Sequence, residues 1–161
     1  MSHETRYEND LKPRLEKLAH QQSLPFCYGC YIEAPSGRCP KCLSDDLMRL
    51  VRGDGCEYGI EWVVRHLIEA NLTPLDAESG FEESITDCYP ETTKVGWIEL
   101  DTVTILKQLD PISWDMAKSE WVDSQREDGE LVSFDNGGSH YRTYDIEAYL
   151  DEAESKNEKS A

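Results

Sequence analysis

Four cysteines form two Cys-x-x-Cys pairs close together in the chain, Cys27 with Cys30 and Cys39 with Cys42. One pair can place two sulfurs on one side of a metal ion, and a second pair completes the tetrahedron that zinc prefers. Gly29 and Pro40 favour the tight turns that such loops require. We therefore expect a Zn²⁺ site with four ligands: Cys27, Cys30, Cys39 and Cys42.

Other cysteine chemistries fit the sequence less well. Four cysteines can form two disulfides, and one pair can be redox-active. Residues 1–20 are polar and charged, without the apolar segment of a secretory leader, so we expect a cytoplasmic protein with reduced thiols. An iron centre of the rubredoxin kind is the main alternative, because tetrahedral sulfur sites hold either metal. Four thiolates leave no open coordination position, which favours a structural role.

Short strand-like segments flank the two cysteine loops, at residues 26–34 and 46–51. With these loops, the chain resembles the zinc-ribbon class over residues 24–52. The resemblance implies a fold and a metal. It implies no enzyme activity, because ribbons of this class serve as nucleic-acid contacts, protein docking units or structural staples.

The remainder of the chain is strongly acidic. The formal net charge is −17 over 161 residues. Residues 1–52 contain eight basic and seven acidic side chains, whereas residues 53–161 contain eight basic and 26 acidic ones. Such a charge repels nucleic-acid phosphates and attracts basic surfaces. We therefore expect a protein partner with a basic surface, and we expect direct nucleic-acid binding to be unfavourable.

In charge and size the chain is also similar to small acidic plasmid and phage proteins that block restriction or CRISPR machinery by mimicking nucleic acid. That similarity implies an inhibitor that docks on a basic groove. A regulatory adaptor without mimicry is an equally open reading.

A nucleic-acid-binding or transcription-associated regulator is the alternative function. The ribbon segment offers basic and aromatic side chains for local contacts: Arg38, Lys41, Arg49, Arg52, Tyr28 and Tyr31. Glu33, Asp45 and Asp46 nearly cancel these positive charges.

The sequence beyond the ribbon predicts mainly helices. Apolar periodicity and capping signals place them near residues 10–21, 56–71, 81–88, 102–109, 111–127 and 145–150, with a strand over 94–100 and a hairpin around 135–138. We therefore expect an α+β fold in which a small four-cysteine zinc ribbon precedes a mostly helical acidic domain with a short antiparallel sheet or hairpin. No apolar run approaches the ~20 residues of a membrane span.

The expected organisation has four parts: an N-terminal helix over 1–23, the ribbon over 24–52, an acidic α+β domain over 53–150, and a disordered acidic tail over 151–161. Trp114 and Trp121 lie seven residues apart, so they share a helix face and are expected to pack in the core.

No catalytic motif stands out in the sequence. It has no glycine-rich phosphate loop, His-Glu-x-x-His or Gly-x-Ser-x-Gly pattern. Cys88, His140 and Asp145 can be written as a nucleophilic triad, but no spacing supports it. Cys56 and Cys88 are instead expected to be small buried residues. We therefore expect no enzyme activity.

Overall fold

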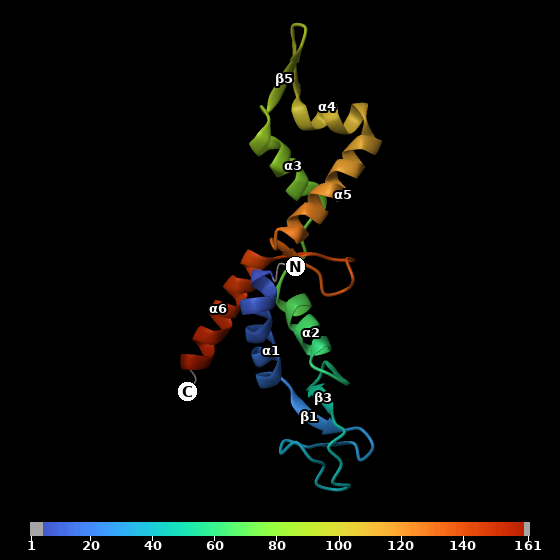
Figure 1. The fold of residues 1–161 in the computed structure, drawn as a ribbon, viewed down its shortest axis with the longest axis vertical. Helices are drawn as coiled ribbons and strands as arrows, with labels where there is room; N and C mark the ends of the chain where they lie inside the picture. The colour runs from blue at the N-terminus through green and yellow to red at the C-terminus, as the bar shows by residue number, and fades with distance from the viewer. Residues whose placement is uncertain (1–4, 160–161) are drawn as a thin grey trace. The chain divides into compact units, whose positions relative to one another are not determined.

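The computed structural model describes residues 5–159, which form two compact units (Figure 1). Unit 1 combines Met1–Thr73 with Thr143–Ala161, and unit 2 is Pro74–Arg142. Unit 2 is therefore inserted in the sequence of unit 1. The fold combines helices with short antiparallel sheets, so the predicted α+β class is confirmed.

Unit 1 has a small antiparallel sheet and three α-helices among its described residues, with one helix preceded by a π-helical turn. The strands are β1 (Leu24–Cys27), β2 (Ile32–Glu33), β3 (Met48–Val51) and β4 (Gly55–Glu57), in the order β2-β1-β3-β4. The helical elements are η1 (Tyr7–Leu11), α1 (Lys12–Gln21), α2 (Glu61–Asn71) and α6 (Thr143–Lys159). Phe26 of β1 pairs with Glu33 on one side and Met48 on the other.

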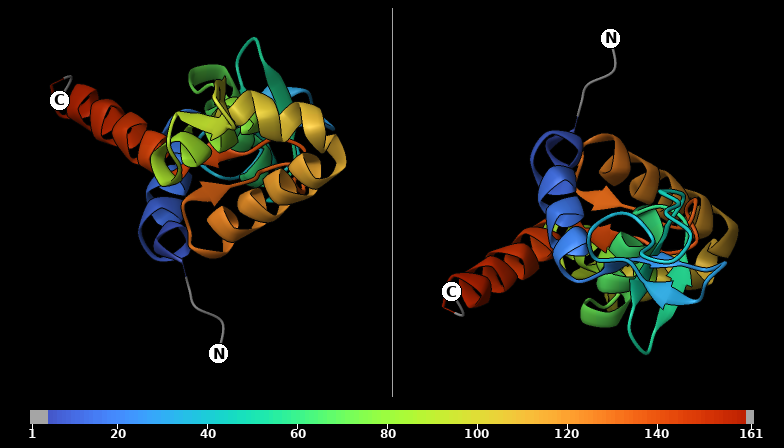
Figure 2. Two further views of the ribbon diagram at one scale, coloured as in Figure 1. Left: turned by 90° about the horizontal axis from the view of Figure 1, so that it is seen from above. Right: turned by 90° about the horizontal axis from the view of Figure 1, so that it is seen from below.

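The core of unit 1 forms where the helices bury one apolar face each. Its fully buried helical side chains come in pairs four or five residues apart, so that each pair lies near one side of its helical segment: Leu11 and Leu15, Val63 and Ile68, Ile146 and Leu150. The first half of α6 lies beside η1 and α1 (Figures 1 and 2). The core of unit 1 therefore combines side chains of α1 with side chains of α6, although the two helices lie far apart in the sequence.

The structure corrects the expectation of a disordered tail for residues 151–159. Residues 160–161 of that tail, and residues 1–4 of the expected N-terminal helix, lie outside the described residues. Helix α6 continues to Lys159. The guanidinium of Arg14 in α1 donates two hydrogen bonds of 2.9 Å to the carboxylate of Glu154, and one of 2.7 Å to Asp151. These contacts hold a polar segment that has no apolar face of its own. The compact units also differ from the expected acidic domain over 53–150, since residues 53–73 and 143–150 lie in unit 1.

Unit 2 consists of three helices and two separate hairpins among the described residues. The helices are α3 (Ala77–Cys88), α4 (Thr102–Leu109) and α5 (Pro111–Glu127). The strands are β5 (Thr92–Val95), β6 (Ile98–Asp101), β7 (Leu131–Val132) and β8 (Tyr141–Arg142). Each helix has an aspartate at its N-cap that accepts a backbone hydrogen bond, as its sequence favours: Asp76, Asp101 and Asp110.

Aromatic side chains make up much of the core of unit 2. The rings of Phe81 and Trp114 lie 4.7 Å apart, and Trp121 is 6.0 Å from Phe81. Leu131 and Tyr141 of the second hairpin are also buried. The predicted packing of the two tryptophans of α5 is confirmed, with Trp114 the more deeply buried.

Two predicted elements differ from the structure. The single strand expected over 94–100 is a hairpin, because Gly96 adopts a φ of 65° and reverses the chain between β5 and β6. The helix expected over 56–71 begins at Glu61, because residues 55–57 pair with β3 as strand β4.

The two ends of unit 2 meet. The backbone N–H of Leu75 donates a hydrogen bond of 2.7 Å to the carbonyl oxygen of His140. The inserted unit is thereby closed where the chain enters and leaves it. Across residues 5–159, no helix is both long and apolar enough to cross a membrane.

Candidate functional site

The four predicted cysteines are brought together in unit 1. Their sulfurs all lie within 4.8 Å of one another, and those of Cys27 and Cys42 are 3.8 Å apart. Four sulfurs bound to one zinc ion, each at ~2.3 Å, lie about 3.8 Å from one another. The cluster therefore has the composition and spacing to hold a metal ion, as the resemblance to a zinc ribbon implied.

Strand pairing positions the two cysteine loops. Cys27 is the last residue of β1 and is followed by the first loop, and the second loop lies between β2 and β3. Strand β1 pairs with both β2 and β3, so it joins the two loops. Cys27 and Cys39 are buried, whereas Cys30 is half-buried and Cys42 is exposed.

Both loops turn through a left-handed residue directly after their second cysteine. Tyr31 has a φ of 56° and Leu43 a φ of 63°. A left-handed conformation costs a side-chain-bearing residue about 1–2 kcal/mol, and such strain persists only where its surroundings impose it. The repetition at equivalent positions indicates that each loop is shaped to wrap the same centre. Sequence reasoning missed these positions because glycine is the usual signal for this backbone.

Backbone hydrogen bonds prepare one sulfur for metal binding. The N–H groups of Cys42 and Lys41 each lie 3.4 Å from Cys39 Sγ. The bond from Cys42 contributes most to lowering the pKa of the Cys39 thiol, which falls to about 6. The neighbouring thiols of Cys42 and Cys39, with burial, instead raise the pKa of Cys30 to about 12. Four thiolates so close together repel one another, so they require a bound cation.

The other predicted reactive residues form no comparable cluster. Cys88 is exposed, which contradicts the expectation that it is buried, and Cys56 is half-buried beside the sulfur of Met48. Cys88 ends α3, about 17 Å along the helix from Ala77. The carbonyl of His140 bonds to Leu75, at the opposite end of that helix. Unit 2 therefore does not place Cys88 beside His140 as a triad would require.

Two of the basic residues that could contact nucleic acid are engaged within unit 1. Arg49 donates hydrogen bonds to the hydroxyl and carbonyl oxygens of Ser23 and to the carbonyl of His20. Arg52 makes two 2.7 Å hydrogen bonds to the carboxylate of Glu33. These contacts stabilise the sheet. Because both guanidinium groups are engaged in them, less positive charge is available near the cysteines for a nucleic acid.

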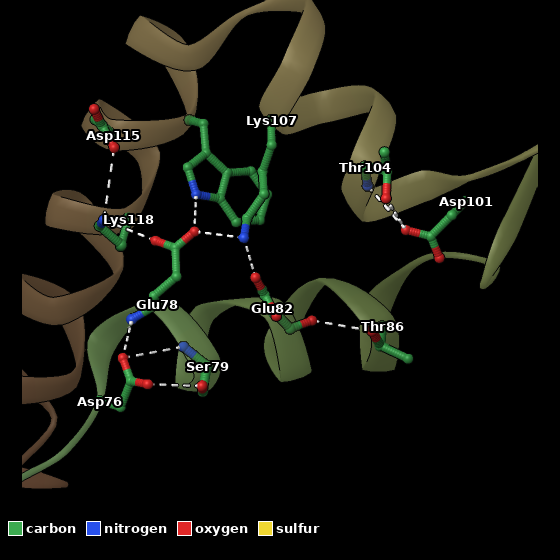
Figure 3. A network of polar contacts seen from close by, with 11 residues as sticks. Asp76, Glu78, Ser79, Glu82, Thr86, Asp101, Thr104, Lys107, Asp115 and Lys118 are labelled. Atoms are coloured by element: carbon green, nitrogen blue, oxygen red, sulfur yellow. Dashed lines mark hydrogen bonds and ion pairs between the residues drawn. The ribbon is translucent and has the colours of Figure 1, made fainter.

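Unit 2 carries the greater part of the chain's net negative charge. Residues 74–142 contain 16 acidic and five basic side chains. An internal network uses two of the basic ones: Glu78 accepts from Lys107 at 2.7 Å, from Lys118 at 2.8 Å and from Trp114 Nε1 at 3.1 Å (Figure 3). Lys107 also pairs with Glu82. Because these lysines are engaged internally, they offer little positive charge to a partner.

The hydrogen bonds from Lys107 and Lys118 lower the pKa of Glu78 to about 2. The carboxylate therefore stays ionised through the physiological pH range and ties α3 to α4 and α5. This network holds the three helices of unit 2 together.

Comparisons with protein-family models, curated proteins and solved structures give no match to this chain. Together, the fold and the site define a protein with a four-cysteine cluster that can hold a metal ion in one unit and an acidic α+β insertion.

Proposed function

We propose that this protein is a zinc-binding protein-interaction module without enzyme activity. A structural Zn²⁺ held by the four cysteines stabilises the ribbon segment of unit 1, and the acidic surface of unit 2 docks on a basic surface of a partner protein. The observation that carries the proposal is the separation of these features: the sulfurs cluster in unit 1, and a net charge of −11 lies on unit 2.

Zinc is the metal that best fits four clustered thiolates, which it binds as a tetrahedron. The closed ligand set provides no position for substrate or water, which supports a structural role. Reduced cysteines are needed for this ligation, so the proposal places the protein in a reducing compartment such as the cytoplasm.

Metal analysis tests the zinc assignment. We expect one zinc ion per chain after purification without chelator, loss of the metal in Cys39→Ser, and retention in the control Cys56→Ser. A chain that is isolated with one iron ion instead, and shows the colour of an iron–sulfur centre, would contradict the assignment to zinc.

The partner is expected to be basic because unit 2 creates a strong negative field. Such a field accelerates association with a positively charged surface and repels acidic partners. A basic groove that normally holds nucleic acid is the form of partner that a nucleic-acid mimic would block. An inhibitor of that kind is the narrower version of this proposal.

Direct nucleic-acid binding is the second candidate, and exposed aromatic rings favour it. Tyr28 and Tyr31 are 63% and 75% exposed beside the cysteine loops, where they could stack on bases. Against this, Arg49 and Arg52 are engaged within unit 1 and the whole chain is acidic. A gel-shift titration with single-stranded DNA and RNA at low salt tests it, and we expect no complex.

Two matched variants test docking through unit 2. The first replaces six exposed carboxylates of unit 2 by their amides: Glu83, Asp87, Glu91, Glu120, Asp123 and Glu127. The second replaces six exposed carboxylates of unit 1 in the same way: Asp45, Asp46, Glu57, Glu61, Glu152 and Glu158. Both variants make the net charge less negative by the same amount, so a difference between them reports where the charge lies and not its total.

We expect a protein captured from the native host by the unchanged chain to be retained by the unit 1 variant and lost by the unit 2 variant. Capture should weaken as salt is raised from 50 to about 300 mM, because exposed charges are screened. Release of the captured protein by added duplex DNA would support mimicry. Equal retention by both variants would contradict docking through unit 2.

A further inference from the structure

The β5–β6 hairpin has one apolar face that stays exposed among the described residues of unit 2. In the register of this hairpin, Val95 pairs with Ile98 and Thr93 with Leu100, so these four side chains share a face. Lys94 and Glu99 pair on the opposite face. Every residue of both strands is exposed. An amphipathic hairpin with its apolar side open is unusual in an isolated chain.

A tryptophan lies at the tip of the hairpin. Gly96 and Trp97 form the two-residue turn, and the positive φ of Gly96 at its first position fits a type II′ turn. The Trp97 side chain is 92% exposed, more than any other large apolar side chain described. The other tryptophans of unit 2 contribute to its core, so the exposure of Trp97 is not a property of the residue type.

The hairpin is rigidly attached to helix α4. The Thr102 hydroxyl lies 2.7 Å from that of Thr93 and donates to the carbonyl of Pro90 at 2.6 Å. The backbone N–H of Thr102 donates to Glu91 at 3.0 Å, and Asp101 caps the helix through Thr104. In Figure 1 the hairpin projects beyond the ends of α3 and α4. A projecting element whose base is fixed loses little entropy when it binds.

We propose that this hairpin is the anchor by which unit 2 binds its partner, and that it docks on a basic amphipathic segment with an apolar stripe flanked by lysines or arginines. The inference rests on the proposed docking function and identifies the surface that performs it. Trp97 and the aliphatic residues of the apolar face become buried on the stripe, while carboxylates elsewhere on unit 2 attract the basic flanks. Tryptophans in such positions dominate binding energies at interfaces.

Charge selects this occupant over a second copy of the chain. The hairpin carries more acidic than basic side chains: Glu91 directly precedes β5, and Glu99 and Asp101 lie on the back face with one cation, Lys94. Unit 2 has a net charge of −11, so two copies facing each other would repel. An anionic membrane surface and nucleic acid would be repelled for the same reason. A basic and apolar segment complements both properties of the surface.

Two peptide probes of equal length and charge test the inference on the full chain loaded with metal. One is a leucine–lysine helix with a continuous apolar stripe, and the other replaces its leucines by serine. We expect the leucine–lysine peptide to bind about thirtyfold more tightly, and Trp97→Ala to remove that advantage, as expected for an interface hot spot. Leu109→Ser, which removes another exposed apolar side chain of unit 2, should retain it.

Tryptophan fluorescence provides an independent readout. The difference spectrum between the unchanged chain and Trp97→Phe should show a fully hydrated indole, which shifts to the blue when the leucine–lysine peptide binds. A buried indole in the free chain, or dimerisation in sedimentation that Trp97→Ala abolishes, would show a different occupant and overturn the inference.

The outcomes also separate this inference from the docking function on which it rests. If both peptides bind equally, with a strong salt dependence and no effect of Trp97→Ala, unit 2 attracts basic partners but the hairpin is not the anchor. If neither peptide binds, the docking function itself fails.

Discussion

At the residue scale, Leu43 shows how the cysteine loops are shaped. Its side chain is exposed while its backbone is left-handed, so a substitution there changes backbone strain with little effect on packing. The N–H of Leu43 donates to the carbonyl of Cys39, so the turn itself is tied to a ligand. The second metal loop therefore stores strain beside its ligands.

Leu43→Gly should bind zinc more tightly than the unchanged chain, because glycine adopts a positive φ without the penalty of about 1–2 kcal/mol. After the greater entropy of an unfolded glycine is subtracted, we expect a gain of up to about tenfold in affinity. Leu43→Val should bind more weakly, since branched side chains disfavour this backbone most. Competition with a chromogenic chelator measures both, and equal affinities would show that the turn does not limit binding.

Glu78 provides a pH-dependent contribution to the stability of unit 2. Its pKa is lowered from the ordinary 4.5 to about 2 by hydrogen bonds from Lys107 and Lys118. A lowered pKa stabilises the fold above the unfolded value of about 4.5, and this contribution is lost as the pH falls towards 2. The ionised Glu78 therefore stabilises unit 2 at neutral pH, and this stabilisation is lost in acid.

Glu78→Gln should unfold at a lower urea concentration than the unchanged chain at pH 7, and the difference should disappear as the pH falls from about 4.5 to 2. Tryptophan fluorescence reports the transition, because the indole of Trp114 donates to Glu78 and Trp121 also packs in unit 2. Glu83→Gln, on the same helix but outside the network, is the matched control. A difference that persists unchanged at pH 2 would contradict the ionic origin of the effect.

At the scale of elements, α6 is where sequence and structure differ most. The residues after Leu150 are too polar to predict a packed helix, and their partner, Arg14, lies far away in sequence. The fully buried Ile146 and Leu150 attach the first half of α6 to unit 1. The second half is held by ion pairs instead.

Ending the chain after Leu150 should destabilise unit 1 by about 1 kcal/mol, the upper range for exposed ion pairs with good geometry. Ile146→Ala should cost more, about 2–5 kcal/mol, because it leaves a cavity in the core. Urea unfolding followed by circular dichroism measures both. If the shortened chain is as stable as the full one, the contacts of Asp151 and Glu154 with Arg14 contribute nothing.

Local signals predicted much of the fold at this scale, and long-range contacts explain what was missed. Asp110 and Pro111 marked the start of α5 because a cap and a proline act on adjacent residues. Gly96 could have revealed the hairpin turn, since glycine at this position is a known signal. Strand β4 and the extent of α6 could not be read from the sequence, because pairing with β3 and Arg14 determines them.

The ligand residues were predictable for a related reason. The four ligands follow from the spacing of the cysteines. The division into two units depends on two long-range contacts, that of Leu75 with His140 and that of α6 with η1. Neither contact can be predicted from the sequence around the residues that make it, because its two sides lie far apart in the chain.

At the scale of the whole molecule, the metal and the acidic surface belong to separate units. The cysteine cluster lies in unit 1, and the core of unit 2 has its own aromatic side chains, including Phe81 and Trp114. Removal of the metal should therefore affect the units unequally.

After chelation we expect faster backbone hydrogen exchange over residues 24–57, because metal binding is coupled to local folding. Exchange in residues 74–142 should be unchanged. Hydrogen exchange with mass spectrometry measures both, and Cys39→Ser without chelator should reproduce the pattern. Faster exchange over unit 2 as well would show that the metal stabilises the whole chain.

The insertion of unit 2 also determines how the molecule would respond to mechanical load. A force applied between η1 and the end of α6 acts first on the contacts that join α6 to η1 and α1, including the pair of Arg6 with Glu147. While those contacts hold, no tension passes through the chain between Thr73 and Thr143. Unit 2 would therefore be shielded until unit 1 opens, and stretching should unfold the two units in that fixed order.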